Sequence, residues 1–324
     1  MAHRILAKRP GGPEVLEYES YEPAAPGPGE ALVRQAAIGL NFIDVYHRTG
    51  LYPVNPPFTP GLEGAGTVEA VGPDVTDLAP GQRVAYAGGP MGAYADLRVM
   101  PAAVLVPLPD SISFETAAAM MLKGITAQYL LRQTYVVKAG DPILYHAAAG
   151  GVGLIVGQWA KHLGAVTIGT VGSPEKAELA RAHGYDHVID YKREDFVARV
   201  KEITDGEGLP VVYDGVGKDT FLRSLDCLRP CGLGVNFGNA SGPVEAFNMG
   251  VLSAKGSLFV TRPTMMTYTR TRELLLASTK DLFDVVASGA VRIEIHQRFP
   301  LAEAAEAHRA LEGRATTGST LLIP

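Results

Sequence analysis

The spacing of hydrophobic positions changes near residue 113. Before that point, short runs rich in β-branched and aromatic residues are separated by glycine and proline turns, which is typical of β-strands. The predicted strands cover residues 31–38, 66–71, 83–86, 94–99 and 104–106. Their spacing predicts a rolled, mainly antiparallel domain. Between them, residues 41–60 predict a long irregular loop, and loops of that length in compact domains are usually functional.

Helical spacing begins beyond Ser113, a predicted N-cap, with helical segments at residues 117–121 and 127–132. From residue 142 onwards, apolar strands alternate with helices. The strands cover residues 142–145, 166–171, 187–190, 210–214 and 232–237, and the helices cover residues 154–163, 174–183, 194–204 and 219–228. Such alternation is typical of a doubly wound parallel sheet. A further apolar run, residues 257–261, predicts an edge strand of that sheet.

The last part of the chain returns to the first pattern. It contains a predicted long amphipathic helix at residues 270–288, a second helix at 302–311 and a closing strand at 319–323. We expect this tail to pack on the first domain, so that the parallel-sheet domain is inserted. The predicted fold class is therefore α/β, with two domains. The mainly antiparallel domain comprises residues 1–123 and 265–324, and the doubly wound domain comprises residues 124–264.

The turn after the first parallel strand, HAAAGGVG at residues 146–153, has the composition of a dinucleotide-binding loop. Against the pattern G-x-G-x-x-G, Ala148 replaces the first glycine, while Gly150 and Gly153 keep the other two places. Backbone N–H groups and the positive end of the following helix favour a pyrophosphate at such a turn. A tight strand-to-helix turn that binds nothing has the same pattern. We interpret His146, at the strand end, as a structural residue rather than a base.

The end of the second parallel strand bears on the choice of cofactor. NAD-selective folds place an Asp or Glu there to bind the ribose hydroxyls. This chain has Gly172 and Ser173 instead, followed by Lys176 in the next helix. A small residue, a hydroxyl and a cation suit a 2′-phosphate, so the expected cofactor is NADPH. The alternative is that Lys176 is an ordinary solvated helix residue.

Composition limits the possible partners. The chain has 324 residues, 47% of them hydrophobic, and a net charge of -5 without a basic block, which argues against nucleic acid and anionic membranes. It contains neither a secretory leader pattern nor an apolar stretch of membrane-spanning length, so we expect a cytoplasmic protein. The two cysteines, Cys227 and Cys231, suit reduced thiols better than a metal pair. No G-x-S-x-G elbow or P-loop is present.

Longer motifs carry a family resemblance. The run PGLEGAGTVEAVG at residues 60–72, followed by PGQRV at 80–84, resembles the signature of the medium-chain dehydrogenase/reductase superfamily, in its zinc-free quinone oxidoreductase (zeta-crystallin-like) branch. The runs NFIDVY at 41–46, LKG at 122–124 and FGNASG at 237–242 resemble bacterial members of that branch. The resemblance covers essentially the whole chain. It implies a GroES-like catalytic domain around an inserted Rossmann domain, with NADPH between them, and homodimers joined through residues 257–261.

The resemblance also implies the cofactor-binding residues. They are Phe42, Ile43, Tyr46, Tyr129, Gly151, Val152, Gly172, Ser173, Lys176, Tyr191, Phe237, Gly238, Asn239, Ser241, Val260, Arg262 and Arg314. We expect Tyr191 to stack on the adenine and Arg314 to give the 2′-phosphate a second cation. Gly215 departs from the pattern, because relatives commonly carry serine there, and a hydroxyl near the cofactor is lost.

The metal-ligand positions of the superfamily are not kept. Its alcohol dehydrogenases hold a catalytic zinc with Cys, His and Cys. By the same resemblance, Asn41 occupies the first ligand position in this chain and Leu62 occupies the second. We therefore expect a metal-free protein. A quinone fits this expectation, because its reduction gives a stabilised aromatic oxyanion that needs no Lewis acid. Asn41 and Tyr46 are the expected hydrogen-bond donors to the acceptor oxygen, and Tyr52 is expected to line the pocket; ordinary loop packing is the alternative.

The leading hypothesis is a zinc-independent NADPH:quinone oxidoreductase that transfers hydride directly from nicotinamide to a quinone in the interdomain cleft. A second enzymatic hypothesis is reduction of activated alkenes such as enones and enals, because hydride addition to a β-carbon produces an enolate that requires the same kind of cleft. A hypothesis of another class is a redox-silent NADPH-binding protein with a structural or RNA-binding role. The acidic charge balance argues against RNA.

Overall fold

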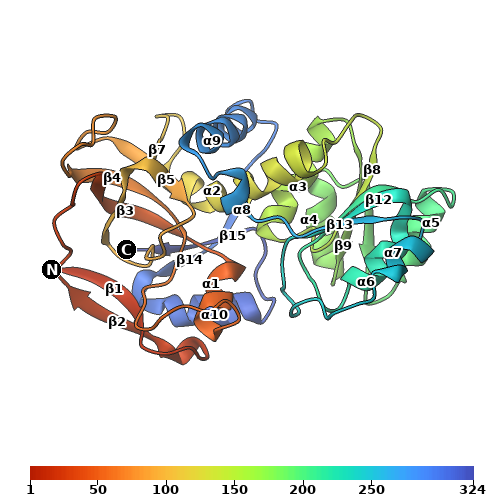
Figure 1. Cartoon of the computed structure of the whole chain (residues 1–324), viewed down its shortest axis with the longest axis horizontal. Helices are drawn as coiled ribbons and strands as arrows, with labels where there is room; N and C mark the ends of the chain where they lie inside the picture. Colours follow the sequence, from red (N-terminus) through yellow and green to blue (C-terminus); the bar gives the residue numbers. More distant parts are fainter. The chain divides into compact units, whose positions relative to one another are not determined.

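A computed structural model describes all 324 residues (Figure 1). The chain divides into two compact units. Unit 1 comprises Met1–Ile125, Thr269–Phe283 and Ile293–Pro324, and unit 2 comprises Thr126–Tyr268 and Asp284–Arg292. The predicted domain ranges, with their roles in acceptor and cofactor binding, stay predictions. No helix in the chain combines the length and the hydrophobicity that crossing a membrane requires.

A seven-stranded, mainly antiparallel sheet forms unit 1, as the sequence predicts. Its strand order is β14 (Ile295–Pro300), β15 (Ser319–Ile323), β3 (Glu30–Leu40), β4 (Glu63–Val71), β5 (Arg83–Ala87) and β7 (Val106–Pro107), with β6 (Leu97–Pro101) paired to β3. Only β14 and β15 pair in parallel within it. A hairpin of β1 (Ala2–Ala7) and β2 (Leu16–Tyr21) lies beside it as a separate sheet. The expected strands at 94–99 and 104–106 are each displaced by a few residues.

The prediction that residues 41–60 are wholly irregular is wrong, because helix α1 (Phe42–Thr49) lies in this stretch. The Asn41 N–H donates to Asp44 Oδ2 at 2.9 Å, which satisfies one N–H at the helix start. Gly50, with φ 82°, ends the helix in the left-handed conformation. The buried face of α1 contains Asp44 and Arg48 as well as apolar residues. The helix is only eight residues long and is followed by a proline-rich stretch, so the whole segment resembles a loop.

One continuous helix, α2 (Phe114–Tyr129), replaces the two segments predicted at 117–121 and 127–132. Gly124 lies inside this helix without breaking it. A Cβ there would lie 2.4 Å from Leu282 Cδ1, so glycine allows α2 to pack closely against the helix that carries Leu282. This packing compensates for the low helix propensity of glycine. A π-helical turn, Leu130–Thr134, follows. The other helices outside the parallel sheet are α8 (Met265–Tyr268), α9 (Arg272–Ala287) and α10 (Ala304–Glu312).

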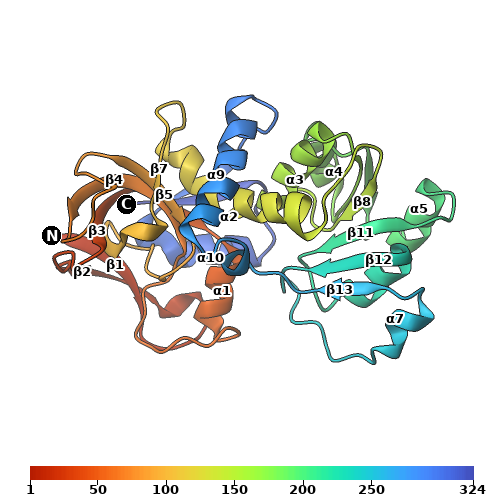
Figure 2. The same ribbon diagram turned by 45° about the horizontal axis from the view of Figure 1, so that its top comes forward.

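Unit 2 is the doubly wound parallel sheet that the sequence predicts. The strand order is β10 (His187–Asp190), β9 (Val166–Val171), β8 (Pro142–Tyr145), β11 (Leu209–Asp214), β12 (Leu228–Asn236) and β13 (Phe259–Thr261). The helices are α3 (Gly151–His162), α4 (Pro174–Ala182), α5 (Phe196–Ile203), α6 (Phe221–Ser224) and α7 (Gly250–Ala254). In Figures 1 and 2, α3 and α4 cover one face of this sheet, and α5, α6 and α7 cover the other.

Strand order reverses between β8 and β11, because β9 and β10 extend the sheet on one side and β12 and β13 on the other. The carboxyl ends of β8 and β11 therefore form the topological switch point at which open α/β sheets bind ligands. The helix predicted at 219–228 is shorter than expected. After α6, the chain continues as a 3₁₀ turn, Leu225–Cys227, and Leu228 already belongs to β12.

Helix α3 packs against the turn after α4 with almost no side chain between the two backbones. A Cβ on Gly157 would lie 2.5 Å from the His183 carbonyl oxygen and 2.4 Å from Tyr185 Cε2. A Cβ on Gly184 would lie 2.7 Å from the Gly157 carbonyl oxygen. Glycine at both positions therefore sets the distance between α3 and this turn.

Replacing Gly157 tests that contact. Alanine normally stabilises a helix interior relative to glycine, but we expect Gly157→Ala to lower the free energy of unfolding by about 1–3 kcal/mol, because the backbone contact cannot yield without moving α3. Urea unfolding measures the change. Lys161→Ala on the same helix removes an exposed pair with Asp186 and is the control, with an expected change below about 0.5 kcal/mol. A Gly157→Ala protein as stable as the parent would contradict the packing argument.

Candidate functional site

The predicted dinucleotide turn joins β8 to α3 at the switch point. Ala147 has a positive φ of 61°, and Gly150 is the extended N-cap of α3. A Cβ on Gly153 would lie 2.5 Å from the carbonyl oxygens of both Ala147 and Ala148. Gly153 therefore lets the first helical turn rest directly on the loop backbone, which is the role of the third glycine in the dinucleotide-binding pattern.

Alanine replaces the first glycine of that pattern because the neighbouring strand makes room for it. Ala148 is fully buried, and its N–H donates to the Thr170 carbonyl oxygen at 3.0 Å. A Cβ on Gly169 of β9 would lie 2.7 Å from the Ala148 Cβ. The methyl group of Ala148 thus occupies space that a side chain at 169 would fill.

The start of α3 fits an anionic pyrophosphate. Gly151, Val152 and Gly153 are its first residues, so their N–H groups have no carbonyl four residues earlier inside the helix. These donors and the positive end of a 12-residue helix meet at one place. Because Gly153 keeps the loop close to the helix, a phosphate can reach the N–H groups directly.

The residues expected at the 2′-phosphate meet at the ends of β9 and β10. A Cβ on Gly172 would lie 2.5 Å from Tyr191 Oη, and Tyr191 is 44% exposed. Ser173 caps α4, because its Oγ accepts from the Lys176 N–H at 3.4 Å. The half-buried Lys176 lies in the first turn of that helix. Hydrogen bonding to Ser173 lowers the pKa of the exposed Glu175 beside it, an acid that the sequence reasoning did not weigh.

The loops after β11 and β12 pack on each other. Ser241 Oγ donates to the Val216 carbonyl oxygen at 2.9 Å and accepts from the Asp219 N–H at 3.1 Å. A Cβ on Gly238 would lie 2.5 Å from the Gly215 carbonyl oxygen, and a Cβ on Gly215 would lie 2.8 Å from Phe237 Cζ. Glycine at 215 is thus matched to the Phe237 ring: a serine there would require the ring to move.

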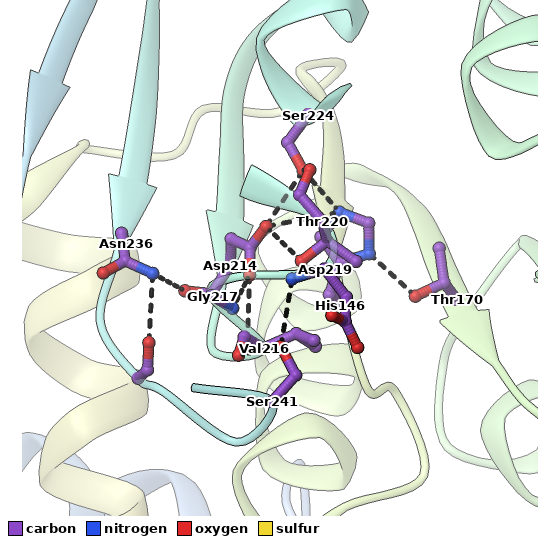
Figure 3. Close-up of polar contacts among 11 residues, drawn as sticks. His146, Thr170, Asp214, Val216, Gly217, Asp219, Thr220, Ser224, Asn236 and Ser241 are labelled. Atoms are coloured by element: carbon purple, nitrogen blue, oxygen red, sulfur yellow. Dashed lines mark hydrogen bonds and ion pairs between the residues drawn. The ribbon is translucent and has the colours of Figure 1, made fainter. Parts of the chain in front are cut away.

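A buried carboxylate that the sequence reasoning missed holds the loop after β11 (Figure 3). Asp214 Oδ1 accepts from the N–H groups of Val216 and Gly217, each at 2.9 Å. Asp214 Oδ2 accepts from Thr220 Oγ1 at 2.7 Å and from Ser224 Oγ at 3.0 Å. The signal for it in the sequence is weak, since a single acidic residue at a strand end has many uses.

His146 belongs to the same network. Its Nε2 lies 2.8 Å from Ser224 Oγ, and its Nδ1 lies 2.9 Å from Thr170 Oγ1. The ring is buried, and burial lowers the pKa of His146. Both ring nitrogens of His146 are engaged in hydrogen bonds. This agrees with the interpretation of His146 as a structural residue rather than a base. Serine lies between His146 and Asp214, so the arrangement is not that of a nucleophilic triad.

The acceptor-site residues expected in unit 1 lie together at α1. The Tyr46 ring lies 5.2 Å from that of Tyr52 and 6.3 Å from that of Phe42. The Tyr52 N–H donates to the Tyr46 carbonyl oxygen at 3.0 Å. Asn41 and Ile43 belong to the same first turn of the helix. The structure therefore places five of the predicted residues on α1, at its N-cap or in the turn that follows it.

Asn41 is held by a buried ion pair that the sequence reasoning also missed. Asn41 Nδ2 donates to Glu63 Oε2 at 2.8 Å and lies 3.4 Å from the Gly39 carbonyl oxygen. The same Glu63 oxygen lies 3.2 Å from Lys123 Nζ, and Glu63 Oε1 accepts from the Leu122 N–H at 2.7 Å. Both charged residues occur in motifs of the family resemblance, but their contact depends on the fold.

A second buried chain runs from α1 to α10. Asp44 Oδ2 lies 3.1 Å from Tyr94 Oη, which lies 3.0 Å from His308 Nε2. His308 Nδ1 lies 3.1 Å from Arg48 Nη1, and Arg48 forms two hydrogen bonds with Glu312. Burial raises the pKa of Asp44 to about 7, and burial together with the Arg48 charge lowers the pKa of His308 to about 3.

The remaining predicted cofactor residues are dispersed. Tyr129 is buried and stacks on Tyr268 with ring centroids 4.6 Å apart. Val260 lies on β13, and Arg262 Nη1 lies 3.3 Å from the Asn236 carbonyl oxygen at the end of β12. Arg314 is exposed and belongs to unit 1. Their contacts with a cofactor stay predictions, as do those of Asn239.

The residues of this chain do not fit a zinc site. No three His, Cys, Asp or Glu side chains gather in a way that could hold a metal ion. At the first two ligand positions, the Asn41 amide is engaged by Glu63, and Leu62 is a buried aliphatic residue. The cysteines lie in unit 2, where Cys227 is buried with its pKa raised to about 12, and Cys231 is exposed. The metal-free state stays a prediction.

Two family models match the chain. The family "Alcohol dehydrogenase GroES-like domain" matches residues 27–110, and "Zinc-binding dehydrogenase" matches residues 151–279. The first match covers much of the antiparallel sheet of unit 1, and the second includes most of the parallel sheet of unit 2. Together they agree with the fold class that the sequence predicts.

Individual proteins resemble the chain over its whole length. A quinone oxidoreductase of Pseudomonas aeruginosa is 61% identical, with 100% of both chains covered. A 2-haloacrylate reductase of a Burkholderia species is 46% identical, covering 100% of this chain and 99% of the relative. The crystal structure of an Escherichia coli quinone oxidoreductase complexed with NADPH has a TM-score of 0.98 and 50% identity, covering 99% of this chain and 100% of that chain.

The buried histidine at α10 predicts a pH dependence of stability. Since the folded-state pKa of His308 is about 3 and an unfolded histidine titrates near 6.5, the unfolded chain binds more protons between these values. The stability contributed by neutral His308 is present above that window and is lost as pH falls through it. Asp44 acts in the opposite sense, because its folded pKa is raised.

We expect the parent to lose more stability than His308→Gln as pH falls from about 6 to about 4, by up to about 1.4 kcal/mol per pH unit. Urea unfolding across this range gives both slopes. Measurements near pH 8, where the histidine is neutral in both states, give the pH-independent effect of the substitution. Parallel slopes for parent and variant would contradict the prediction.

Proposed function

Because the chain belongs to the medium-chain dehydrogenase/reductase superfamily, in its quinone oxidoreductase branch, we propose that it is an NADPH-dependent, metal-independent quinone reductase. Hydride transfer takes place in the cleft between the two domains. The observation that carries the proposal is the full-length identity of 61% with a quinone oxidoreductase. The strand ends of unit 2 support it, because their geometry suits NADPH.

Each part of the cofactor has a matching group in unit 2. The N–H groups of Gly151 and Val152 bind the pyrophosphate at the start of α3. Gly172, Ser173 and Lys176 accept the 2′-phosphate, with the exposed Tyr191 ring beside them for the adenine. The loop 237–241, held by Ser241, borders the nicotinamide half together with Tyr129, Val260 and Arg262. Outside unit 2, Arg314 of unit 1 adds a second cation at the 2′-phosphate.

When bound, NADPH supplies the hydride and both electrons. Residues of unit 1 orient the acceptor. The rings of Tyr46 and Tyr52 provide flat apolar surface for a quinone, and the Tyr46 hydroxyl donates a hydrogen bond to its oxygen. Phe42, Ile43 and Tyr46 contact the cofactor, as the family resemblance implies. Asn41 is a less suitable donor than its sequence position suggests, because its amide is directed at Glu63 and Gly39.

Reduction of activated alkenes is the second candidate. It is favoured by one observation, the 46% identity with a 2-haloacrylate reductase over the whole chain. A haloacrylate and a quinone both place a carbonyl group in conjugation with the carbon that accepts hydride. The same apolar rings and the same oxygen-binding group therefore serve both reactions.

We further propose a homodimer joined through β13. This strand ends the sheet of unit 2, and Phe259 and Val260 on it are 62% and 37% exposed. An edge strand with exposed apolar side chains suits pairing with a second copy. The cytoplasmic location stays a prediction from the sequence.

Lys176→Ala tests the choice of cofactor. Loss of a charge-assisted contact to the 2′-phosphate should raise KM for NADPH by about ten- to a hundredfold while KM for NADH changes little. Steady-state rates with each cofactor measure the effect. Lys201→Ala, an exposed residue of α5, is the control and should change neither value. Equal effects of Lys176→Ala on both cofactors would contradict 2′-phosphate recognition.

The acceptor is tested by following NADPH oxidation with benzoquinone, phenanthrenequinone, an enal and a haloacrylate side by side. We expect the largest kcat/KM with a quinone, because its flat ring matches the aromatic surface at α1. Faster turnover of the enal or haloacrylate would favour the second candidate. Binding of NADPH without turnover of any acceptor would favour a redox-silent role.

A further inference from the structure

A buried ammonium group in unit 1 shares a carboxylate partner with Asn41, one of the proposed acceptor residues. Lys123 is 6% exposed, and its Nζ lies 3.2 Å from Glu63 Oε2. An ammonium group has three N–H donors, and this is the one hydrogen bond that Nζ forms. Two donors of a buried cation therefore have no acceptor within the chain, although buried donors are nearly always satisfied.

Glu63 holds the Lys123 ammonium group through one of its N–H donors and leaves the other two without an acceptor. The carboxylate is fully buried, and it also accepts from the Leu122 N–H at 2.7 Å and from Asn41 Nδ2 at 2.8 Å. A Cβ on Gly39 would lie 2.2 Å from Glu63 Oε2, so strand β3 leaves space for this oxygen. The hydrogen bonds of Glu63 to Asn41 and Leu122 fix the carboxylate, and the carboxylate in turn fixes the position of Lys123 Nζ.

Asn41 connects this ion pair to the acceptor residues. It caps α1, the helix that contains Tyr46. The Asn41 side-chain amide donates to Glu63 Oε2, and the same oxygen contacts the Lys123 ammonium group. Two other buried charged groups, Asp44 and Arg48, lie on α1. Lys123 is the cation that shares the Glu63 oxygen with Asn41.

We propose that Lys123 is a catalytic residue that binds the acceptor oxygen and stabilises the negative charge formed there. The proposal rests on the proposed reductase function and deepens it. NADPH, when bound, would supply hydride to an acceptor carbon conjugated with the carbonyl group. The displaced π electrons would reach the carbonyl oxygen as negative charge, and water would supply the one proton that completes the reduced product. Lys123 keeps its proton throughout and donates a charge-assisted hydrogen bond to the oxyanion.

The competing explanation is that Lys123 merely neutralises Glu63. Removing one partner of a buried pair leaves an uncompensated charge and destabilises the fold. Lys123→Met alone would then lose activity for a structural reason. The double variant Glu63→Gln with Lys123→Met removes both charges, so it separates the two explanations if its thermal unfolding shows that it folds.

A phenolate probe tests the contact without turnover. The complex of the full-length protein with NADP⁺ is titrated with para-nitrophenol at a pH where the free probe is half ionised. The visible absorbance of the probe reports its ionisation, and its phenolate oxygen imitates the reduced acceptor. We expect the bound probe to be mostly ionised in the parent, and its affinity to fall about tenfold or more in both variants lacking Lys123. Lys8→Met, which removes an exposed pair with Glu17, is the control and should behave as the parent.

The outcomes are distinct. Retained ionisation and affinity in the folded double variant would overturn the role of Lys123, as would a parent that binds the probe in its neutral form. Absence of NADPH oxidation with every acceptor would instead overturn the proposed function. Loss of probe ionisation in the folded double variant, together with lower kcat for a quinone, would support the contact.

Discussion

Buried carboxylates have to find their hydrogen bonds inside the protein, and this requirement organises both units. Glu63 in unit 1 accepts from Asn41, Leu122 and Lys123, so it joins the start of α1, strand β4 and helix α2. Asp214 in unit 2 accepts from two loop N–H groups and two hydroxyl groups. An unpaired buried charge costs several kcal/mol. The loops around each carboxylate are therefore held in one arrangement.

The second constraint is the close approach of backbones at the strand ends. Gly153 lets α3 rest on the loop before it, and Gly169 leaves space for the methyl group of Ala148. Gly172 leaves space for Tyr191 in the same way. In each case, one residue lacks a side chain so that a neighbour can occupy its place. A binding surface built from backbone N–H groups needs this proximity, because a side chain between loop and ligand would block the donors.

The two units divide the work that we propose for the enzyme. Unit 2 offers helix N–H groups and Lys176 to the phosphates, whereas unit 1 offers aromatic rings and, by our inference, the Lys123 ammonium group to the acceptor. A fixed cation suits a neutral substrate that becomes an anion during reduction. Because Glu63 holds Lys123 in place, the positive charge is already positioned before the substrate binds.

The sequence by itself determined the α/β class, the order of the parallel strands along the chain and the turn at residues 146–153, because these depend on local hydrophobic period and on glycine placement. It missed helix α1, since two helical turns followed by a proline-rich stretch resemble an irregular loop. The contacts of Glu63 with Lys123 and of Asp214 with Ser224 were decided only by the tertiary structure. Partners 60 and 10 residues apart along the chain meet only when strands and helices pack, and no local pattern records which buried charge will satisfy which donor.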